Sequence, residues 1–206
     1  CIRDSYTPFH GCGWKLVPEA LRGLGVKNLY CVEQQMVLDG TFPTVASPNP
    51  ENPEGFYLAI ELADKVGADF ILGTDPDSDR VGIMVRGADG KFIAVTGNQT
   101  GVLLLDYLIG ALRRAGKMPE KPVFLKSIVT TNMARKVAES NGVTCYDTFT
   151  GFKFMAEKKG ELESSGQGEV IMSYEESYGY MLGDYVRDKD AVTASLMVTE
   201  MAGWYA

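Results

Sequence analysis

The feature that most constrains the fold is the alternation of short apolar runs with longer amphipathic runs along the chain. Apolar runs such as "DFIL", "PVFLKSIV" and "EVIMSY" are separated by segments of helical periodicity, such as "GFYLAIELADKVG" and "TNMARKVAESNG". A crossover long enough to hold a helix is typical of parallel strands. The sequence therefore predicts an α/β protein with mixed, mainly parallel sheets flanked by helices.

A β-hairpin marks the predicted domain boundary. The runs "VGIMV" and "KFIAV" face each other across the turn "ADG", and the second ends near Val95. A chain of 206 residues has room for two domains of about 100 residues each. We expect a first α/β domain over residues 1–95 and a second over residues 96–206.

Charge and cysteine usage exclude several classes of protein. The net charge of −7 argues against nucleic acid or an anionic membrane as the main partner. No apolar run approaches the length of a membrane span. The four cysteines form no CxxC pair, which favours free thiols in a reducing cytoplasm over a disulfide scaffold or a zinc site.

The stretch "GTDPDSDR" concentrates negative charge between two apolar runs. Asp75, Asp77 and Asp79 stand at alternate positions, and Arg80 follows them. Carboxylates this close repel one another unless a cation compensates them, and Mg²⁺ prefers such hard oxygen ligands. Arg80 would then hold phosphoryl oxygens beside the ion. A solvated acidic turn is the alternative, since Asp, Pro and Ser are common turn residues.

A phosphohydrolase of the haloacid dehalogenase type would explain part of the same stretch. "DSDRV" matches the D-x-D-x-[TV] pattern of that class, with Asp77 as nucleophile and Asp79 as acid/base. Asp184 and Asp188 in "GDYVRD" would complete its metal site. Two points argue against this alternative. The nucleophile should follow the strand directly, whereas "GTDP" intervenes before Asp77. Asp75 is also left without a role.

A second group of polar residues lies in "MSYEESYGY". Glu175 and Ser177, two positions apart after a predicted strand, could bind adjacent sugar hydroxyl groups. A surface loop with a capping Ser-Glu pair is equally compatible with these letters. The nearby "TGFK" and "RDKD" add Lys153, Arg187 and Lys189, each of which alone is weak evidence for a site.

Together, "GTDPDSDR", "TGFK" and "YEESYGY" followed by "RDKDA" resemble the α-D-phosphohexomutase family of phosphoglucomutases and phosphomannomutases. "PFHGCG" and "FPTVASPNPENPE" extend the resemblance along nearly the whole chain, and the Tyr-rich loop is most similar to the phosphoglucomutase/phosphopentomutase branch. The family has four domains, and this chain resembles the second, with its metal-binding loop, and the third, with its sugar-binding loop.

The resemblance implies a role for each motif residue. It makes Asp75, Asp77 and Asp79 ligands of a Mg²⁺ cofactor, places Arg80 beside the reacting phosphoryl group, and makes Lys189 a candidate general acid/base. The implied substrate-binding residues are Thr150, Gly151, Glu175, Ser177 and Arg187.

The implied activity is intramolecular phosphotransfer between sugar 1-phosphate and sugar 6-phosphate, through a phosphoserine and a bisphosphate intermediate. Glucose phosphates are the expected substrates, and mannose and pentose phosphates stay open. "VASPNP" resembles the family's nucleophile loop, but Pro48 replaces its histidine, so we do not assign Ser47 as the nucleophile. We expect that serine in the missing first domain. The fourth domain is missing too, so the chain alone should be inactive.

Overall fold

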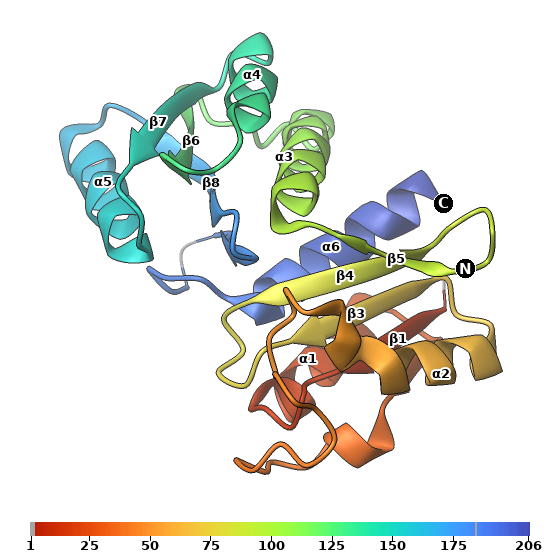
Figure 1. Ribbon diagram of the computed structural model, residues 1–206. Helices are drawn as coiled ribbons and strands as arrows, with labels where there is room; N and C mark the ends of the chain where they lie inside the picture. Colours follow the sequence, from red (N-terminus) through yellow and green to blue (C-terminus); the bar gives the residue numbers. More distant parts are fainter. Residues whose placement is uncertain (1–2, 184) are drawn as a thin grey trace. The chain divides into compact units, whose positions relative to one another are not determined.

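The computed structural model describes residues 3–183 and 185–206, which form two compact units (Figure 1). The first unit runs to Thr96 and also includes Ala191–Ala206. The second unit is Gly97–Asp190. The last helix therefore packs with the first unit. Our sequence analysis had included it in the expected second domain, residues 96–206.

The sheet of the first unit combines parallel and antiparallel strands. Its order is β2-β1-β3-β4-β5, with β1 parallel to both β2 and β3. β4 is antiparallel to β3 and β5, which confirms the predicted hairpin. The strands are β1 (Asp4–Thr7), β2 (Leu29–Cys31), β3 (Phe70–Thr74), β4 (Val81–Arg86) and β5 (Phe92–Val95).

Helices cover both faces of this sheet. α2 packs on one face, where its small residues Ala59 and Ala63 join a core that includes Phe56 and Ile71. α1 and α6 pack against each other and cover the other face, as Figure 1 shows. The elements are α1 (Gly13–Leu24), η1 (Glu33–Gln35), η2 (Pro53–Phe56), α2 (Tyr57–Val66) and α6 (Ala191–Tyr205).

The second unit has a smaller sheet in the order β7-β6-β8-β9. β6 is parallel to β7 and β8, and β9 runs antiparallel to β8. α5 packs on one face, over a core that includes Leu125, Met155 and Leu162. The elements are α3 (Gly97–Arg114), β6 (Pro122–Ser127), α4 (Asn132–Ser140), β7 (Thr144–Thr148), α5 (Phe152–Ser165), β8 (Glu169–Glu175) and β9 (Gly179–Met181).

The α/β prediction with helix-flanked, mixed sheets is confirmed, although two strands were not predicted. β1 was missed, and β9 lies within the segment that we expected to be a loop. Tyr180 of β9 is fully buried and stacks on Tyr174 of β8, with ring centroids 5.9 Å apart. The "EESYGY" segment therefore forms the tip of the β8–β9 hairpin, between Glu175 at the end of β8 and Gly179 at the start of β9.

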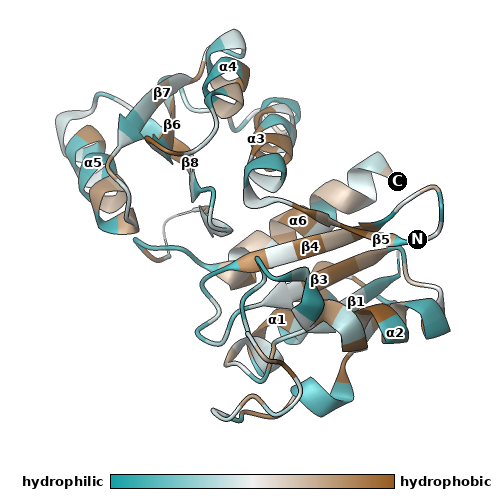
Figure 2. Ribbon diagram, viewed as in Figure 1, coloured by the Kyte–Doolittle hydropathy of each residue, from teal (hydrophilic) through white to brown (hydrophobic). Residues whose placement is uncertain are grey.

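Hydropathy follows the layers within each unit. In Figure 2 the strands β3 and β4 are largely apolar, whereas the loop that joins them is hydrophilic. In the part of the chain that the structure describes, no helix combines the length and the apolar character that a membrane span requires.

One core position of the first unit holds a carboxylate. Asp4 of β1 is 1% exposed. Burial, reinforced by the charge of Asp69, raises the pKa of Asp4 from 3.8 to about 6. In the unfolded chain the Asp4 carboxyl ionises near pH 4. Its ionisation therefore lowers the stability of the folded unit as the pH rises from 4 through 6.

We therefore expect Asp4→Asn to stabilise the first unit at neutral pH. The gain in free energy of unfolding should be about 0.5 kcal/mol at pH 4 and reach about 3 kcal/mol above pH 7. Urea unfolding can be followed by tryptophan fluorescence, because both tryptophans, Trp14 and Trp204, belong to this unit. Glu61→Gln, on the exposed side of α2, should show no such pH dependence. An equal gain at pH 4 and pH 8 would contradict the argument.

Candidate metal site and ligand-binding loop

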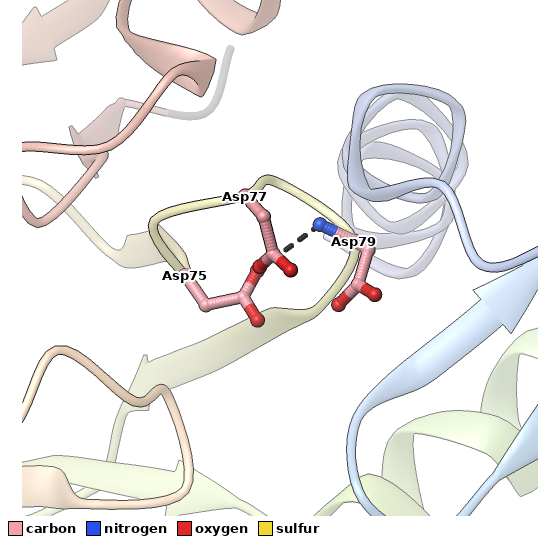
Figure 3. A group of neighbouring side chains, drawn as sticks. All are labelled: Asp75, Asp77 and Asp79. Carbon is pink, nitrogen blue, oxygen red and sulfur yellow. Dashed lines mark hydrogen bonds between the residues drawn. The ribbon is translucent and has the colours of Figure 1, made fainter.

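The three aspartates of the acidic loop lie together in the structure. Each offers a carboxylate oxygen, and these oxygens all lie within 4.8 Å of one another. Asp75 is buried directly after β3, Asp79 is half-buried and Asp77 is exposed. Figure 3 shows the three carboxylates close together on the loop between β3 and β4. The loop therefore presents three negative oxygen donors to one point.

Asp75 organises the acidic loop. Its Oδ1 accepts hydrogen bonds from the backbone N–H groups of Asp79 (3.1 Å) and Arg80 (2.9 Å). Its Oδ2 accepts a 2.6 Å bond from Nε of Arg80, which also forms a 3.5 Å ion pair with Glu51. The buried carboxylate thus fixes both the turn and the guanidinium group beside it.

Burial dominates the electrostatics of Asp75. It raises the pKa of Asp75 to about 6, against the opposing effect of the hydrogen bonds from Arg80. The charges of Asp79 and Asp77 raise the pKa further. The three carboxylates and the single guanidinium group of Arg80 give the segment Asp75–Arg80 a net negative formal charge, which a bound cation would offset.

The acidic loop fits a hard divalent cation. The oxygens of ligands on opposite sides of such an ion are separated by about 4–5 Å, close to the spread of the three aspartates. All three donors are carboxylate oxygens, the type that Mg²⁺ and Ca²⁺ prefer. The group contains no sulfur or imidazole donor among its described ligands, so it is less suited to zinc.

Neighbouring segments hold the acidic loop in place. Cys12 donates its backbone N–H to the carbonyl oxygen of Pro76 at 2.8 Å. Gly11 lies so close to the Pro76 backbone that a Cβ atom would clash with it. On the other side, the first N–H of α6, from Ala191, donates to the carbonyl oxygen of Ser78 at 3.1 Å. Ser78 itself has a positive φ of 58°, an uncommon conformation for serine.

The second unit brings Glu175 and Gly151 together. Glu175 is the last residue of β8, and its Oε1 accepts a 2.7 Å hydrogen bond from the backbone N–H of Gly151. Gly151 has φ 110° and precedes α5, so its backbone conformation favours glycine. Thr150 is exposed beside it, and Ser177 is half-buried in the β8–β9 turn.

Lys189 lies near these residues, whereas Arg187 is held elsewhere. The stem of Lys189 packs on Gly179 of β9, and its Nζ lies 5.5 Å from the ring centroid of Phe152, which follows Gly151. Arg187 instead forms a 2.7 Å ion pair with Glu163, near the far end of α5. That position is roughly 18 Å along the helix from Gly151. Among the expected substrate-binding residues, Arg187 is thus held away from Gly151, near the other end of α5.

Our sequence analysis missed Glu176, a residue that holds the β8–β9 turn in place. Oε2 of Glu176 accepts hydrogen bonds from Oγ of Ser127 (3.0 Å) and Oγ1 of Thr130 (2.9 Å). Ser127 is the last residue of β6 and Thr130 follows it, so the β8–β9 turn is tied to the end of that strand. In the sequence, Glu176 stands directly after the candidate residue Glu175 in "EESYGY", and this position could have identified it.

The contact between Glu175 and Gly151 can be tested in isolation. Glu175→Ala removes the acceptor, so hydrogen exchange of the Gly151 amide should accelerate about tenfold, the loss of one charge-assisted bond. NMR-detected exchange measures it. Glu169→Ala, at the exposed start of the same strand, is the matched control and should leave this amide unchanged. Equal exchange in both variants would show that the bond contributes nothing to the order of the loop.

These features define an α/β protein in which an acidic, metal-compatible loop joins β3 and β4 of one sheet and a polar hairpin tip joins β8 and β9 of the other. Two family models match the chain: phosphoglucomutase/phosphomannomutase alpha/beta/alpha domain II over residues 3–90, and domain III of the same family over residues 96–203. The chain belongs to the phosphoglucomutase/phosphomannomutase family.

Individual relatives agree with this assignment. A phosphoglucomutase of Staphylococcus haemolyticus is 38% identical over 93% of this chain, which covers 34% of that protein. The chain spans about a third of the length of the curated relatives it matches.

Solved structures show the same fold at low sequence identity. A phosphoglucomutase/phosphomannomutase family protein from Burkholderia thailandensis matches 98% of this chain and 42% of its own, with TM-score 0.67 and 22% identity. An Aspergillus fumigatus N-acetylphosphoglucosamine mutase, solved with GlcNAc-6P and magnesium, matches 98% of this chain and 46% of its own, with TM-score 0.64 and 10% identity.

The haloacid dehalogenase alternative has no support. Both matching family models describe phosphohexomutase domains. Asp77, its required nucleophile, is an exposed turn residue two positions beyond the buried Asp75 that follows the strand. Asp184 lies outside the described residues. Asp188 accepts hydrogen bonds from the backbone N–H and the Nζ of Lys189.

Proposed function

We propose that this chain forms the metal-binding and sugar-binding part of a phosphohexomutase that interconverts sugar 1-phosphate and 6-phosphate. The observation that carries the proposal is the convergence of Asp75, Asp77 and Asp79 at the end of β3, in a chain matched by both family models. Glucose phosphates are the proposed substrates, and mannose and pentose phosphates are the alternatives.

In this proposal the acidic loop holds Mg²⁺, which supplies positive charge to a phosphoryl group during transfer. Asp75 also fixes Arg80, whose guanidinium group suits a bidentate contact with phosphoryl oxygens. The short bond between them supports a role for Asp75 in orienting Arg80 as well as in binding the ion.

The hairpin tip of the second unit would bind the sugar. Within the described residues, Oε2 of Glu175 has no hydrogen-bond partner and could bind a sugar hydroxyl while Oε1 is bound to Gly151. Ser177 and Thr150 add hydroxyl groups. Lys189 is the proposed general acid/base, since its Nζ lies 5.5 Å from the ring centroid of Phe152, the first residue of α5. Arg187 remains a proposed substrate ligand, and binding would require it to leave Glu163.

The family's phosphoserine would come from a first domain of the longer protein. Ser47 is not proposed for this role. Its Oγ accepts a 2.7 Å hydrogen bond from Nδ2 of Asn52 within the proline-rich loop. We place the protein in the cytoplasm, because the described cysteines Cys12, Cys31 and Cys145 are free thiols, as expected in a reducing compartment.

Calorimetry on the 206-residue chain tests the proposal. Glucose 1-phosphate should bind with a Kd on the order of 1 mM, and Ser177→Ala should weaken it several-fold, the loss of one hydrogen bond. Mutase turnover should be absent from the chain alone. Binding of no hexose or pentose phosphate, with or without Mg²⁺, would overturn the assignment of the hairpin tip. Turnover that Ser47→Ala abolishes would overturn the assignment of the nucleophile.

A further inference from the structure

A cavity of about 350 Å³ lies in the first unit, away from the acidic loop. The start of β1, the connection after α1 and the C-terminal half of α6 line it. Asp4 of the cavity pairs with Phe70, the first residue of β3, whereas Asp75 follows the last residue of that strand. Because β1 and β3 are parallel, the cavity and the acidic loop lie at opposite ends of the sheet.

Two residues that line this cavity each carry a buried oxygen with no hydrogen-bond partner among the described residues. These oxygens are Oδ1 of Asp4, whose side chain is 1% exposed, and Oγ1 of Thr199 on α6, which is 6% exposed. More than nine in ten buried polar groups in proteins are hydrogen-bonded, so each of these unpartnered oxygens needs an explanation. Both can accept a hydrogen bond, which indicates a ligand that donates.

The buried carboxylate of Asp4 puts negative charge at the cavity. Asp4 lines it, and Asp69 lies close enough to raise the pKa of Asp4. Lys27, exposed on the α1–β2 connection, is the basic residue among the described lining residues. A donor that is also positively charged satisfies both the unpartnered oxygens and the negative charge of Asp4.

The volume favours an organic cation over a metal ion. One water molecule occupies about 30 Å³ in the liquid, so a bare ion would leave most of the cavity empty. Cavities that bind small molecules in proteins begin at roughly 300 Å³. Leu24 and Val26 provide an apolar part of the wall. We propose that this cavity binds a small organic molecule through a primary ammonium group, held by Asp4 and Thr199, with its apolar part against Leu24 and Val26.

NMR titration of the chain with n-butylammonium chloride tests the proposal. Shifts should concentrate at the amides of Gly25 and Gly203, which line the cavity, with a Kd on the order of 1 mM. Uncharged 1-butanol should bind about tenfold more weakly, because it lacks the charge. Potassium chloride at the same ionic strength should produce no comparable shifts. Equal binding of 1-butanol, equal shifts with potassium, or no saturable shifts at these two glycines would each overturn the proposal.

Substitutions that change one charge distinguish binding in the cavity from nonspecific attraction of a cation to the protein surface. Asp4→Asn should weaken n-butylammonium binding about tenfold, and Lys27→Gln should strengthen it about twofold by removing a like charge. Glu19→Gln, exposed on α1 but outside the cavity, removes the same charge as Asp4→Asn and should leave the affinity unchanged. Lys27 is exposed, so its variant is not expected to affect folding. Equal affinity in the Asp4, Lys27 and Glu19 variants would show that the cavity carries no specific cation site.

Discussion

Gly97→Ala is expected to lower the free energy of unfolding of the second unit by about 3 kcal/mol, the upper range for overpacking. A Cβ atom at Gly97 would clash with the carbonyl oxygen of Glu176 and lie 2.9 Å from the backbone nitrogen of Tyr178. Both neighbours are backbone atoms of the β8–β9 turn, which cannot move without displacing Ser177. Native-state hydrogen exchange at β6 and β8 reports the change.

The same helix provides the control for this prediction. At Gly110 a Cβ atom would meet the terminal atoms of the flexible Arg114 side chain and no backbone atom. Gly110→Ala should therefore stabilise α3 by about 0.5–1 kcal/mol, the difference in helix propensity. If both variants were neutral or stabilising, the close packing of α3 against the β8–β9 turn would be wrong.

Asp77→Asn and Asp79→Asn should each weaken Mn²⁺ binding to the chain about thirtyfold, or ~2 kcal/mol. Mn²⁺ is the spectroscopic substitute for Mg²⁺ in this measurement. Each substitution replaces a charged oxygen donor by a neutral one without a large change in shape. Asp77 is exposed, so the loss in its variant should reflect coordination. Asp79 also lies 3.8 Å from Nε of Arg80, so its variant loses that ion pair as well. Electron paramagnetic resonance of free Mn²⁺ gives the affinity.

Asp89→Asn controls for a change in net charge within the same unit. Asp89 lies in the β4–β5 turn, where its Oδ1 accepts a hydrogen bond from the backbone N–H of Lys91. Its substitution should alter the Mn²⁺ affinity less than twofold, because exposed charges are strongly screened. Equal losses in all three variants would mean that Mn²⁺ responds to overall charge and that the acidic loop is no specific site.

The fold was predictable where one residue pattern determined an element. Amphipathic periodicity predicted α2 and α4, and the "ADG" turn predicted the β4–β5 hairpin. β1 was not predictable, since Asp4, Ser5 and Thr7 are polar although all its residues are buried. Its strand character comes from pairing between β2 and β3, which local sequence does not encode.

The candidate site was predictable to the extent that its residues are neighbours in sequence. The aspartates converge within one loop, so their spacing alone indicated a cation. The support that Glu176 receives from Ser127 depends on residues 49 positions apart, which only the packing of β6 beside β8 brings together. The ion pair between Arg187 and Glu163 was not predictable either, because these residues are 24 positions apart in the sequence and meet only in the folded unit.

The position of α6 has a consequence for the order of folding during synthesis. The second unit is continuous in sequence and can become fully packed once Asp190 has left the ribosome. The first unit is synthesised earlier but lacks one helix layer until Ala191–Tyr205 emerges. The face of its sheet that α6 covers stays exposed while the whole second unit is translated. The unit whose synthesis starts first is therefore the one that completes its structure last.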